Sequence, residues 1–128
     1  SEQETASRID KFQHFMNGEI LGLKKLIRNF SAGNKQKIGI MSALLNTPRL
    51  LILDEPSLGL APQIVRSIHG TLRQLTSEGM AVLLVEQVAF AALRISDRGY
   101  VIQNGRIAMS GAPDQLLQDP ALVSHYLG

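Results

Sequence analysis

The chain has 128 residues, of which 45% are hydrophobic, and a formal net charge of +2. These values fit one globular domain or part of a larger one, and they exclude a disordered tail. The absence of cysteine excludes disulfide frameworks and thiolate metal sites. No apolar run approaches the roughly 20 residues that span a bilayer, and the polar start SEQETASRID is unlike a signal peptide.

Apolar residues at helical spacing dominate the first third of the chain. We expect residues 1–7 to be frayed, and short helices to follow over 7–16 and 20–29. Ser31 stands where a helix N-cap belongs, and the pattern after it predicts a helix over 32–46.

The rest of the chain alternates between predicted strands and helices. The two aliphatic runs, at residues 50–53 and 81–85, are expected to be strands covered on both faces. Asn104-Gly105 between short apolar runs is the strongest short hairpin signal. This order predicts an α/β fold, with parallel strands, flanking helices, a C-terminal β-hairpin and small helices. The expected elements are strands at 50–53 and 81–85, helices at 62–79 and 88–96, hairpin strands at 100–103 and 106–110, and helices starting near Pro113 and Pro120.

Two adjacent carboxylates, Asp54 and Glu55, directly follow the first predicted strand. Ligands bind at the carboxyl ends of strands in a parallel sheet. Asp54 is therefore a candidate to hold Mg²⁺ beside nucleotide phosphates, directly or through a water. Glu55 could orient or deprotonate an attacking water. The alternative interpretation is a pair of solvated acids where a strand meets a loop.

Four segments together resemble the ATP-binding-cassette (ABC) ATPases of transporters. LLILDEP resembles their Walker B segment, SLGLAP their D-loop, FSAGNKQKIGIMSALLNTPRLL their signature region, and GMAVLLVEQ the strand that ends in the switch residue. The resemblance covers about residues 30–128 and implies a P-loop NTPase-like fold. The segments SLGLAP, LVEQ and the terminal HYLG are most similar to ATPase subunits of branched-chain amino-acid importers.

The resemblance implies roles for individual residues. Asp54 matches the magnesium-associated acid, Glu55 the catalytic base and Gln87 the switch residue. Ser57 to Ala61 match the D-loop, which crosses a dimer interface in this family. Ser31, Gly33 and Asn34 match signature positions that contact the γ-phosphate held by a second subunit. A Ser N-cap and a bare backbone N–H at a helix start also suit a phosphate on physical grounds.

Some positions depart from the family pattern. Phe30, Ala32 and Asn34 replace three of the five usual signature residues, and Gln87 stands where many relatives carry His. Ala32 is compatible with a close backbone approach if its φ is negative. Asn34 is shorter than Gln and weakens a capping-box contact.

The chain contains no Gly-Lys pair, so it lacks the phosphate-cradling P-loop, or Walker A motif. The resemblance therefore implies the C-terminal half of a nucleotide-binding domain. We expect residues 1–47 to form part of its helical subdomain and residues 48–128 the second half of its core. Such a piece should bind ATP poorly and hydrolyse it negligibly alone. It should also expose an apolar face of the strands and self-associate.

The function implied is that of a subunit fragment that binds and hydrolyses ATP to power solute import, with branched-chain amino acids as the favoured solute. ATP and Mg²⁺ are the implied cofactors. A second ATPase subunit in a head-to-tail dimer and the membrane subunits of a transporter are the implied partners. The expected location is the cytoplasmic face of the membrane, without insertion into it. The alternative is a non-catalytic dimerisation or interaction module from a truncated ABC ATPase.

Basic residues and histidines give weaker signals. The histidines lack metal-ligand spacing and are expected on helix surfaces or interfaces. The basic residues have few aromatic neighbours, so we interpret them as a solvated helical face and expect no nucleic-acid partner. The histidines are His14, His69 and His125, and the one basic cluster consists of Lys24, Lys25, Arg28, Lys35 and Lys37.

Overall fold

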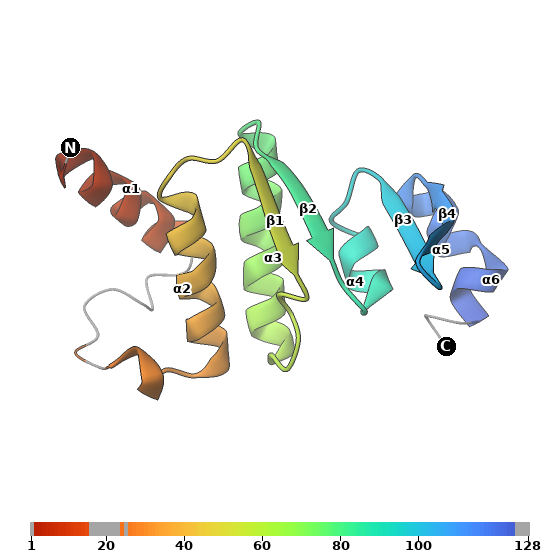
Figure 1. Ribbon diagram of the computed structural model, residues 1–128, viewed down its shortest axis with the longest axis horizontal. Helices are drawn as coiled ribbons and strands as arrows, with labels where there is room; N and C mark the ends of the chain where they lie inside the picture. The colour runs from red at the N-terminus through yellow and green to blue at the C-terminus, as the bar shows by residue number, and fades with distance from the viewer. Residues whose placement is uncertain (1, 16–23, 25, 125–128) are drawn as a thin grey trace. The chain divides into compact units, whose positions relative to one another are not determined.

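The computed structural model describes residues 2–15, 24 and 26–124 (Figure 1). The chain divides into two compact units, residues 1–85 and 86–128, and each is described by itself. The expected boundary between residues 47 and 48 stays a prediction. Within the described part of the chain, no helix combines the length and the apolar composition needed to cross a bilayer.

The first unit begins with helices. Helix α1 spans Glu2–Phe15, a 3₁₀ turn spans Ile27–Asn29, and helix α2 spans Ala32–Leu44. The expectation that residues 1–7 are frayed is wrong, because α1 already begins at Glu2. Two glutamates in its first turn favour this start by complementing the positive end of the helix dipole. Half of the expected helix over 20–29 lies outside the described residues, and its described part contains only the 3₁₀ turn.

A parallel strand pair forms the centre of the first unit. Strand β1 (Leu50–Asp54) pairs with strand β2 (Ala81–Val85), and Ile52 lies directly opposite Leu83. Helix α3 (Pro62–Ser77) connects the two strands. It ends at Ser77, two residues before the expected stop at Gly79, whose φ of +95° is readily adopted by glycine. The amides of Gly79 and Met80 donate to the carbonyls of Thr76 and Leu75 and close the helix end.

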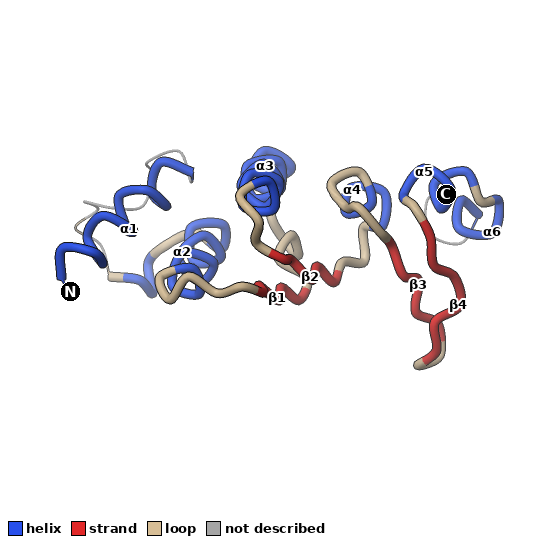
Figure 2. Tube along the Cα trace, turned by 90° about the horizontal axis from the view of Figure 1, so that it is seen from above, coloured by secondary structure: helices blue, strands red, loops and turns tan. Residues whose placement is uncertain are grey.

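Only one face of the strand pair is covered. Figure 2 shows α3 beside β1 and β2 on one side of the sheet. Leu51 and Leu53 are buried, whereas Leu50 and Ile52 are 51% and 61% exposed. The prediction that both faces of these strands are covered is therefore wrong for the described residues. The exposed apolar face instead matches what the family resemblance led us to expect.

Helices α2 and α3 supply most of the core of this unit, and two polar residues lie within it. Lys37 is only 1% exposed, so it does not belong to a solvated face as predicted; its position on the α2 face that carries the core residues accounts for its burial. His69 is 8% exposed and is therefore not on the helix surface as expected; the buried Leu72 lies one turn further along the same face of α3 and accounts for its burial. The apolar core residues of the two helices are Ile40, Met41, Leu44, Ile68, Leu72 and Leu75.

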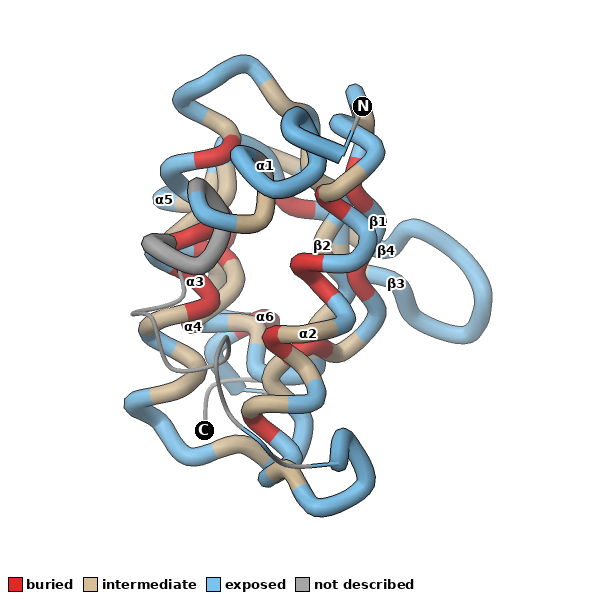
Figure 3. The backbone as a smooth tube through the Cα atoms, turned by 90° about the vertical axis from the view of Figure 1, so that its left-hand side faces the viewer, coloured by how far each residue is buried: buried red, intermediate tan, exposed pale blue. Residues whose placement is uncertain are grey.

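The second unit contains the expected hairpin. Its turn residues Asn104 and Gly105 have φ values of 52° and 72°, as a type I′ turn requires. Figure 3 shows the turn end as an exposed loop. Leu93, Leu116 and Leu122 form the core, and a Cβ at Gly99 would lie 2.5 Å from Leu93 Cδ2. The elements are α4 (Ala89–Leu93), shorter than expected, β3 (Gly99–Gln103), β4 (Arg106–Gly111), α5 (Pro113–Gln118) and α6 (Pro120–Leu122).

Candidate functional site

The two carboxylates lie at the carboxyl end of β1, as the sequence predicts. Asp54 is the last residue of the strand, is paired with Val85 and is exposed. Glu55 is half-buried, and its amide donates to the Val85 carbonyl at 2.8 Å. Its φ is +46°, a left-handed conformation that costs a residue other than glycine about 1–2 kcal/mol. The regular alternation of the strand thus ends immediately after Asp54.

Two successive tight turns connect this strand end to α3. The Leu58 amide donates to the Glu55 carbonyl, and the Leu60 amide donates to the Ser57 carbonyl, both at 3.1 Å. Gly59 has a φ of +69° in the second turn, where glycine is favoured. Ser57 is half-buried. The candidate D-loop, residues 57–61, is therefore ordered by its own backbone hydrogen bonds.

Ser31 caps α2 as the sequence predicts. Its Oγ accepts a hydrogen bond from the Asn34 amide at 3.2 Å, and its carbonyl accepts one from the Lys35 amide at 3.0 Å. This satisfies one of the amides that a helix start leaves without a partner in the helix. Ala32 lies inside the helix, so its φ is negative and its methyl group causes no backbone strain.

Gly33 has a packing role that sequence reasoning missed. It is buried, and a Cβ at this position would lie 3.1 Å from Ile64 Cγ2 on α3. The side-chain-free position therefore lets α2 approach α3 closely. Its place in a signature-like segment suggested only a phosphate contact, because a helix–helix contact between residues 33 and 64 leaves no local trace in the sequence.

The first unit holds most of the candidate residues, in two segments. Asp54, Glu55 and Ser57 follow one another at the end of β1, and the segment from Ser31 to Asn34 starts α2. The Gly33–Ile64 contact joins the start of α2 to the helix that follows the candidate D-loop. Gln87 belongs to the second unit, two residues after the end of β2, and is exposed.

The residues present are compatible with Mg²⁺ bound beside phosphates. Within the described ranges, no group of three or more His, Cys, Asp or Glu side chains could hold a metal ion. Mg²⁺, however, commonly binds through one or two carboxylates and completes its shell with waters and substrate phosphates. An exposed Asp54 at the strand end fits that arrangement.

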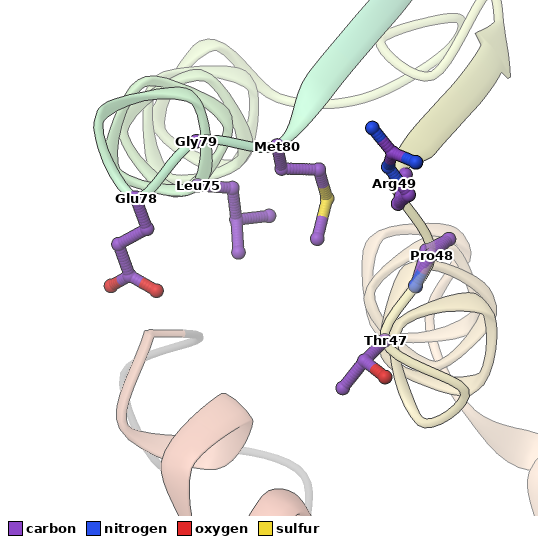
Figure 4. Close-up of a pocket in the computed structure, with 7 residues that line it drawn as sticks. All are labelled: Thr47, Pro48, Arg49, Leu75, Glu78, Gly79 and Met80. Carbon is purple, nitrogen blue, oxygen red and sulfur yellow. The ribbon is translucent and has the colours of Figure 1, made fainter.

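A hollow of about 240 Å³ lies elsewhere in the first unit. Arg49 precedes β1 and Met80 precedes β2, so these lining residues mark the amino ends of the two strands (Figure 4). The carboxylates lie at the opposite, carboxyl ends, where ligands bind in parallel sheets. The hollow is therefore not the candidate nucleotide site. Its remaining lining residues are Thr47, Pro48, Leu75, Glu78 and Gly79.

Comparisons with known proteins agree with this arrangement. The protein-family model described as ABC transporter matches residues 2–58 of this chain. The chain is 49% identical over 98 residues to the high-affinity branched-chain amino acid transport ATP-binding protein BraG of Pseudomonas aeruginosa, covering 77% of this chain and 42% of BraG. It is 32% identical over 100 residues to the lipopolysaccharide export system ATP-binding protein LptB of Acidithiobacillus ferridurans, covering 78% of this chain and 42% of LptB.

A solved structure agrees along the whole chain. The ADP conformation of MJ1267, an ATP-binding cassette of an ABC transporter, superposes with a TM-score of 0.81 at 28% identity, covering 100% of this chain and 52% of MJ1267. The chain belongs to the ABC transporter ATPase family. The P-loop NTPase-like fold is thereby confirmed.

This ABC chain spans about half the length of the relatives it matches, 42% of BraG and 52% of MJ1267. The family match also begins at residue 2 and so takes in α1, which precedes the segments that carried the resemblance. Because the relatives serve different transport systems, the match shows the family but not the solute.

Proposed function

We propose that this chain is part of the ATPase subunit of an importer and that the solute of this importer is a branched-chain amino acid. The observation that carries the proposal is the Asp54-Glu55 pair at the carboxyl end of β1. The solute is suggested by the 49% identity to BraG, which is named for branched-chain amino acid transport. LptB, at 32% identity, is named for lipopolysaccharide export, so the solute is the finer part of the proposal.

In this proposal the two carboxylates have different roles, magnesium binding and proton acceptance. Bound Mg²⁺ would neutralise charge on the triphosphate, and the exposed Asp54 carboxylate would hold it, directly or through a water. Glu55 would accept a proton from the attacking water. The left-handed φ of Glu55 and the hydrogen bond from its amide to Val85 fix the backbone that carries this base.

The remaining candidate residues would bind and sense phosphate. The capped start of α2, from Ser31 to Asn34, would contact the triphosphate held by a second copy of the subunit, because a helix start offers amide donors and a positive dipole end. Ser57 in the D-loop would lie at the same subunit interface. Gln87 would hydrogen-bond the γ-phosphate through its side-chain amide. Membrane subunits of a transporter would anchor this assembly at the cytoplasmic face of the membrane.

A chimera tests the proposal. This chain replaces the segment of BraG that it matches, and phosphate release is measured with ATP and Mg²⁺. We expect turnover in the chimera, and a loss of about a hundredfold or more when Glu55 is changed to Gln, since a general base contributes roughly that factor or more. The control is Glu78→Gln, an exposed carboxylate at the far end of α3, which should leave turnover unchanged. Undiminished turnover in E55Q would contradict the role assigned to this residue.

A non-catalytic interaction module is the second candidate function. The exposed aliphatic face of β1 and β2 favours it, as does the lack of a Gly-Lys pair in these 128 residues. Under this alternative the chain would associate with other subunits without binding ATP. Calorimetry of the 128-residue chain with ATP and Mg²⁺ tests this alternative, because sub-micromolar binding would refute an inert module.

A further inference from the structure

One contact joins the start of α2 to the start of α3. Gly33 lies in the first turn of α2 and is buried, and Ile64 lies in the first turn of α3 and is half-buried. An added Cβ at Gly33 would lie 3.1 Å from Ile64 Cγ2 and 3.4 Å from Ile64 Cγ1. The first of these distances is shorter than ordinary van der Waals contact, so Ile64 or α2 would have to shift.

Another glycine in α2 shows that this closeness is specific to Gly33. Gly39 lies in the same helix, is exposed, and would have no neighbour within 4 Å of an added Cβ. An alanine at Gly39 would change the helix propensity of α2 without touching another element. Gly39 therefore provides a matched comparison in which the steric effect at Gly33 is absent.

Ile64 also connects to the candidate D-loop through its backbone. Its amide donates to the carbonyl of Ala61 at 2.9 Å, and the Val65 amide donates to the same carbonyl at 3.2 Å. Ala61 is the N-cap residue of α3 and directly follows the two turns that start at Glu55 and Ser57. Ile64 thus contacts α2 with its side chain and the D-loop with its backbone.

We propose that Ile64 is a positioning residue, which holds the Ser31-capped start of α2 at a fixed place relative to the D-loop. The inference rests on the proposed function, in which both segments face the nucleotide of a second subunit. Gly33 is required because only a residue without a Cβ leaves room for the Ile64 methyl group at this approach. A shift of α2 by a few tenths of an ångström would displace Ser31 and Asn34 together, since the Ser31 Oγ accepts the Asn34 amide.

Stability alone would be a poor measure of this role. Ile64 is only half-buried, whereas Ile68, Leu72 and Leu75, further along α3, are 1–2% exposed and form the core. Truncation of a core residue would weaken the whole unit, but truncation of Ile64 should loosen the start of α2 preferentially. The measurement must therefore report on individual amides.

Hydrogen exchange of the 128-residue chain, followed by NMR, provides that measurement. Ile64→Ala is expected to speed exchange of the Asn34 and Lys35 amides about twofold or more relative to the amides of β1, a factor that corresponds to the lower end of the coupling between residues in contact. Val65→Ala, on the next residue and also half-buried, should leave this ratio unchanged. Equal acceleration of all amides by Ile64→Ala would overturn the proposal, since that is the result of general destabilisation.

A size exchange gives the second arm of the test. Gly33→Ala should accelerate the same two amides, and the double variant G33A/I64A should return them toward the wild-type rates, because the new methyl group occupies the space of the removed γ carbons. If the acceleration of amide exchange in the double variant equals the product of the accelerations in the two single variants, the proposal is overturned. If Ile64→Ala does not fold, the comparison of Gly33→Ala with Gly39→Ala decides. Equal exchange rates of the Asn34 amide in these two variants would reject the proposed contact between Gly33 and Ile64.

This test uses no nucleotide. A failed chimera experiment would therefore refute the proposed ATPase role while leaving the exchange result standing. Conversely, a failed exchange experiment would remove the positioning role of Ile64 without affecting the assignment of Glu55.

Discussion

Among the described residues, three other than glycine have positive φ values: Thr47, Glu55 and Asn104. Asn104 was predictable, because Asn tolerates the left-handed region and Asn-Gly marks a type I′ turn. Thr47 and Glu55 were not, because neither side chain favours that region and the constraint comes from the strand pairing and helix ends around them. Glu55 is also the candidate general base, and backbone strain is commonly concentrated at functional positions.

Thr47 provides a prediction at the residue scale. It has a φ of 47°, and its amide donates to the Leu44 carbonyl at 2.9 Å just after α2 ends. Thr47→Gly should raise the free energy of unfolding by about 0.5–1 kcal/mol, because relief of the left-handed strain outweighs the added flexibility of glycine in the unfolded chain. Chemical denaturation measures this change.

The control for Thr47 is a threonine in ordinary helical conformation. Thr76 lies in α3, and its Oγ1 donates to the Arg73 carbonyl at 2.9 Å. Thr76→Gly should lower the free energy of unfolding by roughly 0.5–1 kcal/mol, because glycine is a somewhat poorer helix former than threonine and this hydrogen bond is lost. If both variants lose stability by similar amounts, the strain assigned to Thr47 is absent.

At the scale of elements, local signals predicted more than signals that depend on distant contacts. The Ser31 cap, the Gly79 stop and the Asn104-Gly105 turn were readable because each depends on a few neighbouring residues. The burial of Lys37 was not predicted, although its helical spacing from Ile40, Met41 and Leu44 places it on the core face of α2, because a charged side chain is ordinarily expected in solvent. The Gly33–Ile64 contact was missed because it joins two helices that are distant in sequence.

The hairpin gives the prediction for this scale. Gly105 has a φ of +72° in the turn between β3 and β4, so Gly105→Ala should lower the free energy of unfolding by about 1–2 kcal/mol through strain in the left-handed region. Amide exchange in β3 and β4 measures the loss where it arises.

Gly70→Ala serves as the comparison for the hairpin variant. Gly70 lies within α3, and a Cβ there would meet no atom within 4 Å. This substitution should raise the free energy of unfolding by up to about 1 kcal/mol, because alanine favours a helix over glycine. A loss of stability in Gly70→Ala, or none in Gly105→Ala, would contradict the interpretation from backbone conformation.

At the scale of the whole molecule, the uncovered face of the β1–β2 pair distinguishes what the aliphatic runs predict from what the family resemblance predicts. The aliphatic runs alone predicted strands buried on both faces, because that is the usual state of parallel sheets. The family resemblance predicted an exposed face, and Ile52 and Leu83, which lie opposite each other, are 61% and 51% exposed. The aliphatic composition of a strand reflects the elements that pack on both of its faces in a complete fold. The chain spans about half the length of its relatives.

This face should make the 128-residue chain self-associate, since contiguous exposed apolar surface and open strand edges promote contacts between copies. The double variant I52K/L83K places two charges at the centre of the face and should shift the chain toward monomer in sedimentation at high concentration. The control is Leu26→Lys, at a residue that is 60% exposed and lies outside both the sheet and the candidate D-loop. It should leave the association unchanged. A wild-type chain that stays monomeric throughout the concentration range, or a Leu26→Lys effect as large as that of the double variant, would show that the sheet face does not drive association.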